Sequence, residues 1–262
     1  MLSLTDTGPF TACPTPFNLA GHVLARAAAL ADKTAVAVVS EHGAEAMSYA
    51  ALRAAVLGTA TGLVQAGFSP GDIVLMRLGN TLDFPVAYLG ALAGGLVPVP
   101  TSSALTEPEV ARIIAELRPR VVLHDPDVAT AGGAPHMGLH TLRALRDSPP
   151  AKVHQGDPNR LGYIVYTSGT SGQPRAVGHA HRAIWARQMM FRHWYGLTDA
   201  DTVLHAGAFN WTYTLGTGLM DPWSVGATAL IPAPGTASGD LSALAAKHNV
   251  TILAAAPGVF RQ

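Results

Sequence analysis

Apolar positions along the chain follow two different periods that succeed each other almost from end to end. Short apolar runs rich in β-branched residues predict strands, and segments with an apolar residue every three or four positions predict helices. The predicted strands span residues 34–40, 73–78, 96–99, 121–123, 161–166, 203–206, 227–231 and 251–253. The predicted helices span residues 22–31, 48–66, 81–93, 139–146, 181–195, 214–223 and 242–249, and a further helix begins near residue 106. This alternation predicts an α/β fold with mostly parallel sheets flanked by helices.

Turn and capping residues support several of these boundaries. A polar turn at residues 41–44 predicts a hairpin between the first strand and a short partner strand. Ser48 is a suitable N-cap for the helix that follows, and Gly67 stands where a C′ glycine is expected. Residues 106–109 form a capping box with proline in the first turn. The weakest pattern begins at residue 125, so the stretch 125–160 is a candidate for a boundary between two subdomains.

The loop after the predicted strand 161–166 has the composition of an anion-binding site. Glycines at positions 169 and 172 permit positive φ values and close backbone approach, so successive N–H groups can point into one concavity. Phosphate is the natural ligand, because hydroxyls donate to its oxygens and Arg175 supplies a permanent positive charge. The hydroxyls belong to Thr167, Ser168, Thr170 and Ser171. A flexible polar turn is the alternative, since the same residue types cluster in ordinary turns.

The order of residues in this loop excludes one phosphate-binding motif and matches another. A Walker motif would need a second glycine where Pro174 stands, followed by a lysine. The run from Tyr166 to Arg175, YTSGTSGQPR, closely resembles the phosphate-loop signature of the adenylate-forming enzymes. That family includes acyl-CoA synthetases, luciferases and the adenylation domains of peptide synthetases. Two residues depart from its pattern, because the family most often has Lys in place of Arg175 and Gly in place of Ala176.

The resemblance implies that this loop binds the phosphates of ATP. The implied phosphate contacts come from Thr167, Ser168, Gly169, Thr170, Ser171, Gly172 and Arg175. Among them, Thr170 and Arg175 are implied to act in catalysis. In the family's reaction a carboxylate attacks the α-phosphorus of ATP and releases pyrophosphate, and a thiol, here that of coenzyme A, then displaces AMP. The loop and Mg²⁺ would stabilise the leaving pyrophosphate, so no side chain need act as a nucleophile.

A second informative segment, residues 208–223, is rich in aromatic side chains. Large aromatics just after a strand of an α/β sheet lie where such sheets bind ligands, although aromatics also fill ordinary cores. The segment resembles the acyl-pocket region of acyl- and aryl-CoA synthetases. The resemblance implies that Trp211 and Tyr213 border the organic acid, whereas Pro222 and Trp223 pack the scaffold. The acid could be fatty or aromatic, because half of the family's pocket lies beyond this segment.

The resemblance runs from about Leu19 onward but covers only the first half of the family's pattern. Three later parts of the pattern have no counterpart here: the Tyr-Gly-x-Thr-Glu motif, the ribose-binding Asp and the C-terminal domain with its catalytic Lys. The chain has only Lys33, Lys152 and Lys247, and none of them is placed to take the role of that catalytic Lys. We expect residues 1–20 to be a poorly ordered leader and residues 21–262 to form part of an N-terminal AMP-binding domain, with the C-terminal half of the same protein missing. The chain alone is then expected to be inactive and to bind ATP weakly.

Composition narrows the classes of partner. The formal net charge is +0, so the broad basic surface of a nucleic-acid-binding protein is absent. Charged residues make up only 13%, against about 25% in ordinary domains, which predicts burial against a further domain or a second subunit and leaves a homo-oligomer open. Cys13 is the single cysteine, which favours a reducing, cytoplasmic location. Prolines and glycines interrupt the uncharged run 84–106, so no membrane span is expected.

Several alternatives remain beside the ligase hypothesis. His179 and His181 lack the further ligands that zinc needs, and the Asp125/Asp127 and Asp199/Asp201 pairs resemble turn aspartates more than a divalent-ion site, so no metal site is predicted. A non-catalytic nucleotide- or phosphate-binding module would account for the loop without the reaction. A peptide-synthetase adenylation domain would need an Asp near Asn210 to bind the substrate amine, and none lies within residues 207–219.

Overall fold

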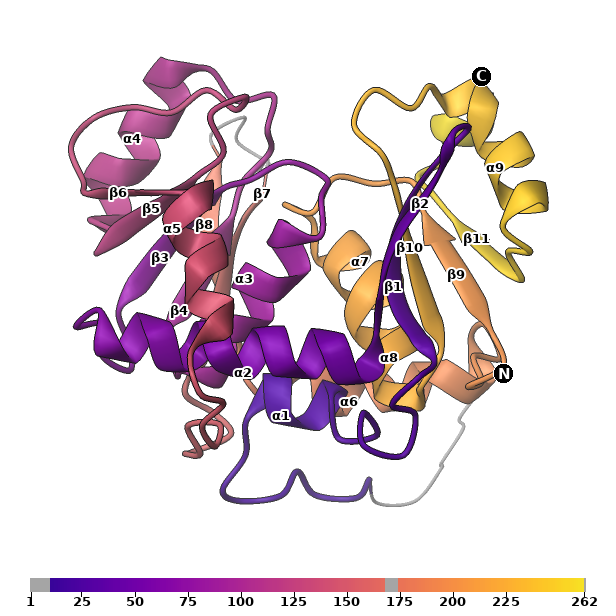
Figure 1. The fold of residues 1–262 in the computed structure, drawn as a ribbon, viewed down its shortest axis with the longest axis horizontal. Coiled ribbons are helices and arrows are strands. Elements are labelled where there is room, and N and C mark those ends of the chain that lie inside the picture. Colours follow the sequence, from indigo (N-terminus) through magenta and orange to yellow (C-terminus); the bar gives the residue numbers. More distant parts are fainter. Residues whose placement is uncertain (1–9, 168–173, 262) are drawn as a thin grey trace, which may run out of the picture.

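The chain folds into two sheet-containing lobes that share one continuous core. The computed structural model describes residues 10–167 and 174–261. Figure 1 shows the two lobes side by side, with the N-terminal half of the chain forming most of one lobe and the C-terminal part forming most of the other. The α/β class predicted from the alternating periods is confirmed.

One sheet has the strand order β11–β9–β10–β1–β2. Its strands are β1 (Thr34–Ser40), β2 (Gly43–Ser48), β9 (Thr202–His205), β10 (Thr228–Pro232) and β11 (Ile252–Ala254). β1 pairs in parallel with β10, and β9 lies in parallel between β10 and β11. β1 and β2 form the predicted antiparallel hairpin.

The second sheet has the order β4–β3–β5–β6 and is parallel throughout. Its strands are β3 (Ile73–Arg77), β4 (Val97–Pro100), β5 (Val121–His124) and β6 (His136–Gly138). A separate antiparallel pair, β7 (Leu161–Thr167) with β8 (Arg175–Ala180), packs alongside β4. The phosphate loop predicted from the sequence therefore begins at the end of one of these paired strands and finishes at the start of the other.

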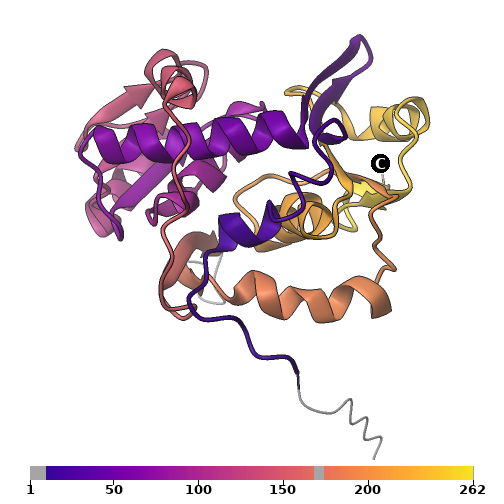
Figure 2. The ribbon, with the colours of Figure 1, turned by 60° about the horizontal axis from the view of Figure 1, so that its bottom comes forward.

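Helices cover both sheets. They are α1 (Leu19–Val23), α2 (Tyr49–Gln65), α3 (Asp83–Ala93), α4 (Glu107–Leu117), α5 (Leu139–Ala144), α6 (Ala183–His193), α7 (Thr212–Leu215), α8 (Asp221–Val225) and α9 (Leu241–Lys247), with short 3₁₀ or π turns at η1 (Leu145–Asp147), η2 (Gly216–Met220), η3 (Ser238–Asp240) and η4 (Val259–Arg261). The long helix α2 contacts β1 and β2 of one lobe and α3 and η1 of the other, so it ties the lobes together. Figure 2 shows α6 on the far side of α1 from α2, so that α1 lies between the two longer helices. Among the described residues, none of these helices is both long and apolar enough to cross a membrane.

Most predicted helix boundaries are confirmed, but one predicted helix ends early and two strands were not predicted. Ser48 caps α2 through the Ala51 amide, Gly67 has a φ of 89°, and the capping box of α4 is present. The predicted helix 22–31 is wrong beyond Val23, because the next residues form turns whose Arg26 side chain reaches Val225 and Asp199. That tertiary contact overrides the helix propensity of the alanines. β6 and β8 were not predicted, since neither has an alternating apolar pattern and each depends on its partner strand.

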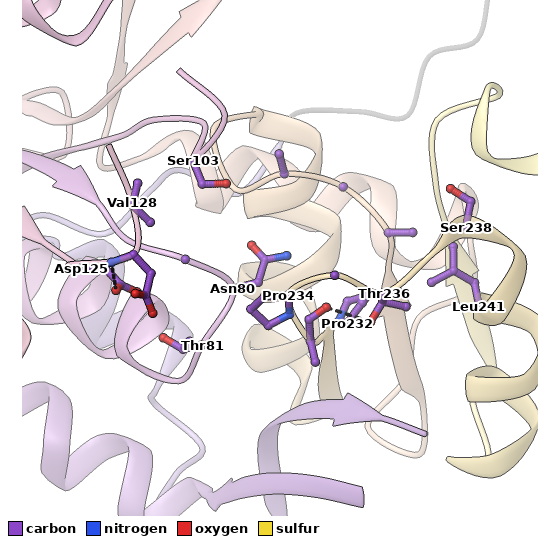
Figure 3. Close-up of a pocket in the computed structure, with 17 residues that line it drawn as sticks. Asn80, Thr81, Ser103, Asp125, Val128, Pro232, Pro234, Thr236, Ser238 and Leu241 are labelled. Atoms are coloured by element: carbon purple, nitrogen blue, oxygen red, sulfur yellow. Dashed lines mark hydrogen bonds between the residues drawn. The ribbon is translucent and has the colours of Figure 1, made fainter. Parts of the chain in front are cut away.

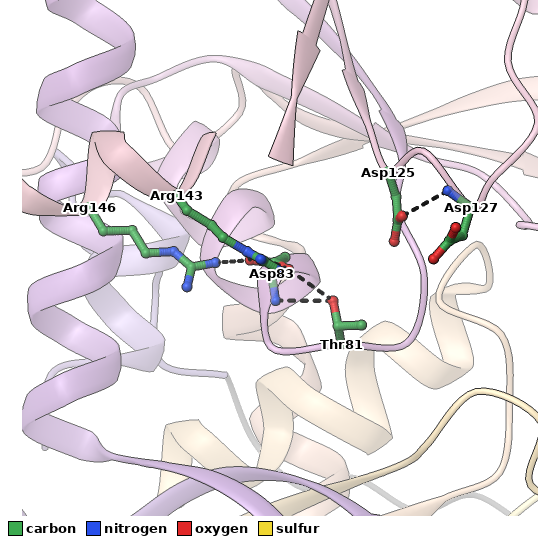
Figure 4. Close-up of polar contacts among 6 residues, drawn as sticks. All are labelled: Thr81, Asp83, Asp125, Asp127, Arg143 and Arg146. Atoms are coloured by element: carbon green, nitrogen blue, oxygen red, sulfur yellow. Dashed lines mark hydrogen bonds and ion pairs between the residues drawn. The ribbon is translucent and has the colours of Figure 1, made fainter. Parts of the chain in front are cut away.

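The ion pairs around Asp83 attach the start of α3 to the α5–η1 segment (Figure 4). Asp83 is 3% exposed and accepts hydrogen bonds from Arg143 and Arg146. Burial alone would raise the pKa of this carboxyl, but the hydrogen bonds and charges of the two guanidinium groups outweigh burial and lower it. The two ion pairs hold α5 and η1 against α3, on one side of the lobe that contains β3 to β6.

Helix α2 packs against η1 so closely that only glycine fits at the contact. A Cβ atom at Gly58 would overlap the carbonyl oxygen of Arg146. Gly58→Ala would add about 1 kcal/mol of helix propensity, yet we expect a net loss of about 1–3 kcal/mol because backbone must move apart. Urea unfolding of the chain measures the change. Gly132→Ala is the control, since a Cβ there meets nothing within 4 Å, and an equal loss in both variants would contradict the packing argument.

Candidate functional site

The two ends of the predicted phosphate loop lie directly opposite each other. Thr167 ends β7, Arg175 begins β8, and the two residues are register partners in the antiparallel pair. Both are exposed, so their side chains are available to a ligand. Ser168, Gly169, Thr170, Ser171 and Gly172, which were predicted to bind phosphate, lie outside the described residues. The phosphate contacts and the catalytic role of Thr170 therefore stay predictions.

A cavity of about 720 Å³ opens beside this loop, and we call it the Trp211 cavity. It is lined by Thr101, Ser102, Leu105, Glu109, Arg112, Ile113, Glu116, Val165, Tyr166, Thr167, Pro174, Asn210, Trp211 and Thr212. Its walls come from the loop after β4, from one face of α4, from the end of β7 and from the loop before α7. The structure thus brings two predicted site residues, Thr167 and Trp211, to one cavity.

A hydrogen bond from Tyr166 holds α4 against β7 at this cavity. The Tyr166 hydroxyl donates to Glu116 at 3.0 Å. Burial raises the pKa of Tyr166, and the hydrogen bond and negative charge of Glu116 raise it further, so the phenol stays neutral and remains a donor. Sequence reasoning missed Glu116 and Arg112 as cavity residues. No motif marks them, and only the packing of β7 beside β4 places α4 next to the loop.

The aromatic segment divides between the core and the cavity. Phe209 stacks on Phe84 at 4.3 Å between ring centroids, and Trp223 is fully buried, so both belong to the core. Trp211 is 48% exposed and lines the Trp211 cavity. Tyr213 is half-buried and does not line that cavity; it packs edge-on against His205 at 4.6 Å. Burial lowers the pKa of His205 to about 4, so the ring against Tyr213 is neutral near pH 7.

A second cavity of about 480 Å³ lies between the lobes, and we call it the central cavity (Figure 3). It is formed where β3, β5, β9 and β10 end, which is the edge at which parallel sheets bind ligands. Its polar lining includes Asn80, Ser103 and Asp125. Thr81 and Thr236 also line it, but their hydroxyls donate to Asp83 and to the Ala233 carbonyl. Among the described residues, its lining includes two carboxylates, Asp125 and Asp127, and no Lys, Arg or His. A polyphosphate is therefore disfavoured here. The Trp211 cavity also has two carboxylates, Glu109 and Glu116, but its lining includes the cation Arg112. Its lining residue Pro174 directly precedes the exposed Arg175.

The histidines and aspartates considered as metal ligands have other contacts. His181 is fully buried and accepts a hydrogen bond from the Leu19 amide, whereas the ring of His179 stacks on Tyr163 at 4.7 Å. The paired aspartates form turn contacts: Asp125 accepts from the Asp127 amide, and Asp201 accepts from Thr198. No group of three or more His, Cys, Asp or Glu side chains suited to a metal ion occurs within the described ranges.

His181 links the strand that follows the phosphate loop to the N-terminal segment. The Leu19 amide donates to its Nδ1 at 3.0 Å, so the neutral ring carries its proton on Nε2. Burial and the nearby positive charge of Arg160 lower the pKa of His181 to about 3 from an ordinary 6.5. The folded state therefore binds a second proton on this ring less readily than the unfolded state does.

We expect this histidine to destabilise the fold on acidification. The neutral ring's contribution to the free energy of unfolding is complete above about pH 6.5. It is lost as the pH falls toward 3, by up to about 1.4 kcal/mol for each pH unit. Denaturant unfolding at pH 7, 6 and 5 measures the slope. His181→Asn keeps a hydrogen-bond acceptor without the titration and should reduce the slope over this range, with the buried His205 supplying part of what remains. An unchanged slope in that variant would show that other groups cause the pH dependence.

Comparison with known proteins decides the family. The family model described as AMP-binding enzyme matches residues 24–262. The chain belongs to the AMP-binding enzyme family. This AMP-binding chain is 28% identical to the 3-hydroxybenzoate–CoA/4-hydroxybenzoate–CoA ligase of Thauera aromatica, over 93% of its own length and 50% of the ligase. Its fold matches a benzoate CoA ligase from Burkholderia xenovorans LB400 with a TM-score of 0.77 and 25% identity, over 90% of the chain and 50% of that ligase.

A synthase outside the CoA ligases also matches. A plipastatin synthase of Bacillus subtilis is 25% identical over 88% of the AMP-binding chain and 9% of the synthase. The chain spans about half the length of the CoA ligases it matches. The fold is that of the N-terminal domain of adenylate-forming enzymes, as the sequence predicted.

Proposed function

We propose that the chain contributes the ATP- and acid-binding half of an acid–thiol ligase. The enzyme would join a carboxylate to AMP with release of pyrophosphate, and would then transfer the acyl group to coenzyme A. The observation that carries this proposal is the position of Thr167 at a cavity that also contains Trp211, with its register partner Arg175 directly opposite it at the far end of the phosphate signature. The proposal takes Mg²⁺ to enter with ATP as part of the substrate.

Within this proposal, each part of the cavity has a separate task. Arg175 neutralises charge on the leaving pyrophosphate, because a fixed guanidinium interacts most strongly with the charge that develops as the bond breaks. Trp211 supplies an exposed apolar surface for the organic part of the acid. Close placement of carboxylate and α-phosphorus lowers the barrier without a nucleophilic side chain.

We propose an aromatic acid as the substrate. The matched ligases are named for benzoate and hydroxybenzoates. The flat Trp211 side chain at the cavity suits a ring, since aromatic pairs gain about 0.5–1.5 kcal/mol beyond the area they bury. Asn210 stands at the cavity where a peptide synthetase would need an Asp for the substrate amine, which favours an acid without an α-amino group.

Pyrophosphate exchange into ATP tests this function. The protein that carries this chain at the full length of its relatives should exchange pyrophosphate with benzoate-type acids, and should form the CoA thioester when the thiol is added. The 262-residue chain alone should show no exchange, because it spans about half the length of the ligases. Exchange with amino acids only would support the peptide-synthetase alternative. Nucleotide binding without exchange by the full-length protein would support a binding module.

A further inference from the structure

Arg77, the last residue of β3, is a fully buried cation. Its side chain is 0% exposed, and none of the ion pairs found among the described residues includes it. Burial lowers its pKa to about 10, so the guanidinium is still charged near pH 7. The negative charge of Glu109 opposes this lowering but forms no ion pair with Arg77. A buried charge without a directly paired counter-charge costs several kcal/mol unless polar groups surround it. The oxygen atoms that surround Arg77 therefore need a structural or functional explanation.

Those oxygen atoms belong to two loops. Nε donates to the Ala129 carbonyl at 2.8 Å, in the loop after β5. The terminal nitrogens donate to the loop after β4, with acceptors at Thr101 Oγ1 and at the carbonyls of Ser102, Ser103 and Leu105. The Thr101 hydroxyl in turn donates to the Met76 carbonyl at 2.8 Å. Residues 101–105 form no strand or helix, and the Arg77 side chain supplies hydrogen-bond donors to four of them.

The same loop forms walls of both cavities. Thr101, Ser102 and Leu105 line the Trp211 cavity, and Ser103 lines the central cavity. Ala129 follows Val128, which also lines the central cavity. Arg77 itself lines neither, so it can act only through the backbone it holds. A planar group with five N–H donors suits this task, whereas an ammonium group offers three donors at one point.

We infer that Arg77 is a positioning residue, which holds the 101–105 loop in the form that the acid-binding wall of the Trp211 cavity requires. The kinetic part of this inference rests on the proposed function, and the structural part does not. A residue with a structural role alone would lower stability and leave the acid KM unchanged. Substitution of a positioning residue raises the acid KM as well, because the part of the Trp211 cavity wall formed by residues 101–105 loses its fixed shape.

Arg77→Lys tests the inference with two independent measurements, and Arg120→Lys is the matched control at the exposed amino end of β5. In the full-length protein we expect Arg77→Lys to raise the acid KM about tenfold or more, with kcat and the KM for ATP changed less than about threefold. An acid KM equal to that of the parent would overturn the positioning role. Arg77→Met, if it folds, should show a larger increase in the acid KM than the lysine variant.

Hydrogen exchange of the 262-residue chain supplies the second measurement, which needs no activity. Arg77→Lys should speed amide exchange in residues 101–105 and 127–130, while exchange in β1 and β10 stays at the parental rate. Uniformly faster exchange, or no change in these two loops, would overturn the inference. If the parental protein activates no carboxylic acid, the proposed function fails, and the exchange result alone still decides whether Arg77 holds the loops.

Discussion

Arg175→Ala is expected to lower kcat/KM for acid activation by about 100- to 1,000-fold, the loss typical of removing one group that stabilises charge in a transition state. The reason is the position of Arg175 at the start of β8, exposed and opposite Thr167 at the two ends of the phosphate loop. In the proposed reaction, charge develops on the leaving pyrophosphate during adenylation, and a guanidinium held on a paired strand would interact with it. Pyrophosphate exchange by the full-length protein measures the effect.

Two further variants separate charge from geometry. Arg175→Lys restores the residue most common in the family's signature and should keep kcat/KM within about tenfold of the parent, because the charge remains but the fork of donors is lost. Arg53→Ala removes an exposed arginine from α2 and should leave exchange unchanged. If Arg175→Ala and Arg53→Ala behave alike, Arg175 has no part in the reaction. The phosphate loop would then bind its ligand through backbone and hydroxyl groups alone.

Local sequence signals predicted the elements that depend on local chemistry. Ser48 caps α2 because its hydroxyl accepts from an amide three residues away, and Gly67 ends the helix because it adopts a positive φ. β7 was predicted from its apolar run, since the strand is buried along most of its length. β8 was missed because its stability comes from pairing with β7 rather than from its own residues.

The candidate site was predicted only in part, because some of its residues are brought together by tertiary packing rather than by local sequence. The resemblance of the loop to the adenylate-forming signature pointed to Thr167 and Arg175, and the resemblance of residues 208–223 to an acyl-pocket segment pointed to Trp211, because such motifs are carried by consecutive residues. The opposite wall, with Glu116, was not predictable from local pattern. It faces the loop only because β7 packs beside β4 and brings α4 with it.

The aromatic residues of segment 208–223 cannot all be assigned to the core or all to a ligand site. Phe209 and Trp223 are core residues, whereas Trp211 lies at a cavity, although all three come from one stretch of sequence. Phe209 and Trp211 lie in the turn before α7, and Trp223 lies beyond the π turn at η2, so the local backbone sets the direction of each side chain separately. The interpretation of Trp223 as scaffold therefore has a direct energetic test.

Trp223→Ala is expected to lower the free energy of unfolding by about 3–5 kcal/mol. The ring is 0% exposed, and its Nε1 donates to the Ala35 carbonyl at 2.8 Å, which ties α8 to β1. Alanine would leave a large cavity and would remove that hydrogen bond from a buried carbonyl, which adds to the cost. For a chain of this size the midpoint temperature should fall by roughly 10 °C.

Two further variants complete this comparison. Trp223→Phe separates the effect of ring packing from that of the hydrogen bond, and Trp211→Ala compares a cavity-lining tryptophan with the buried one. Phenylalanine keeps most of the buried ring and should cost about 1–2 kcal/mol, mainly for the unpaired Ala35 carbonyl. Trp211→Ala removes an exposed side chain and should change stability by less than about 1 kcal/mol, while raising the acid KM in the full-length protein. Equal destabilisation by the two alanine variants would mean that Trp211 is also a core residue. The proposal that Trp211 supplies the apolar surface for the acid would then fail.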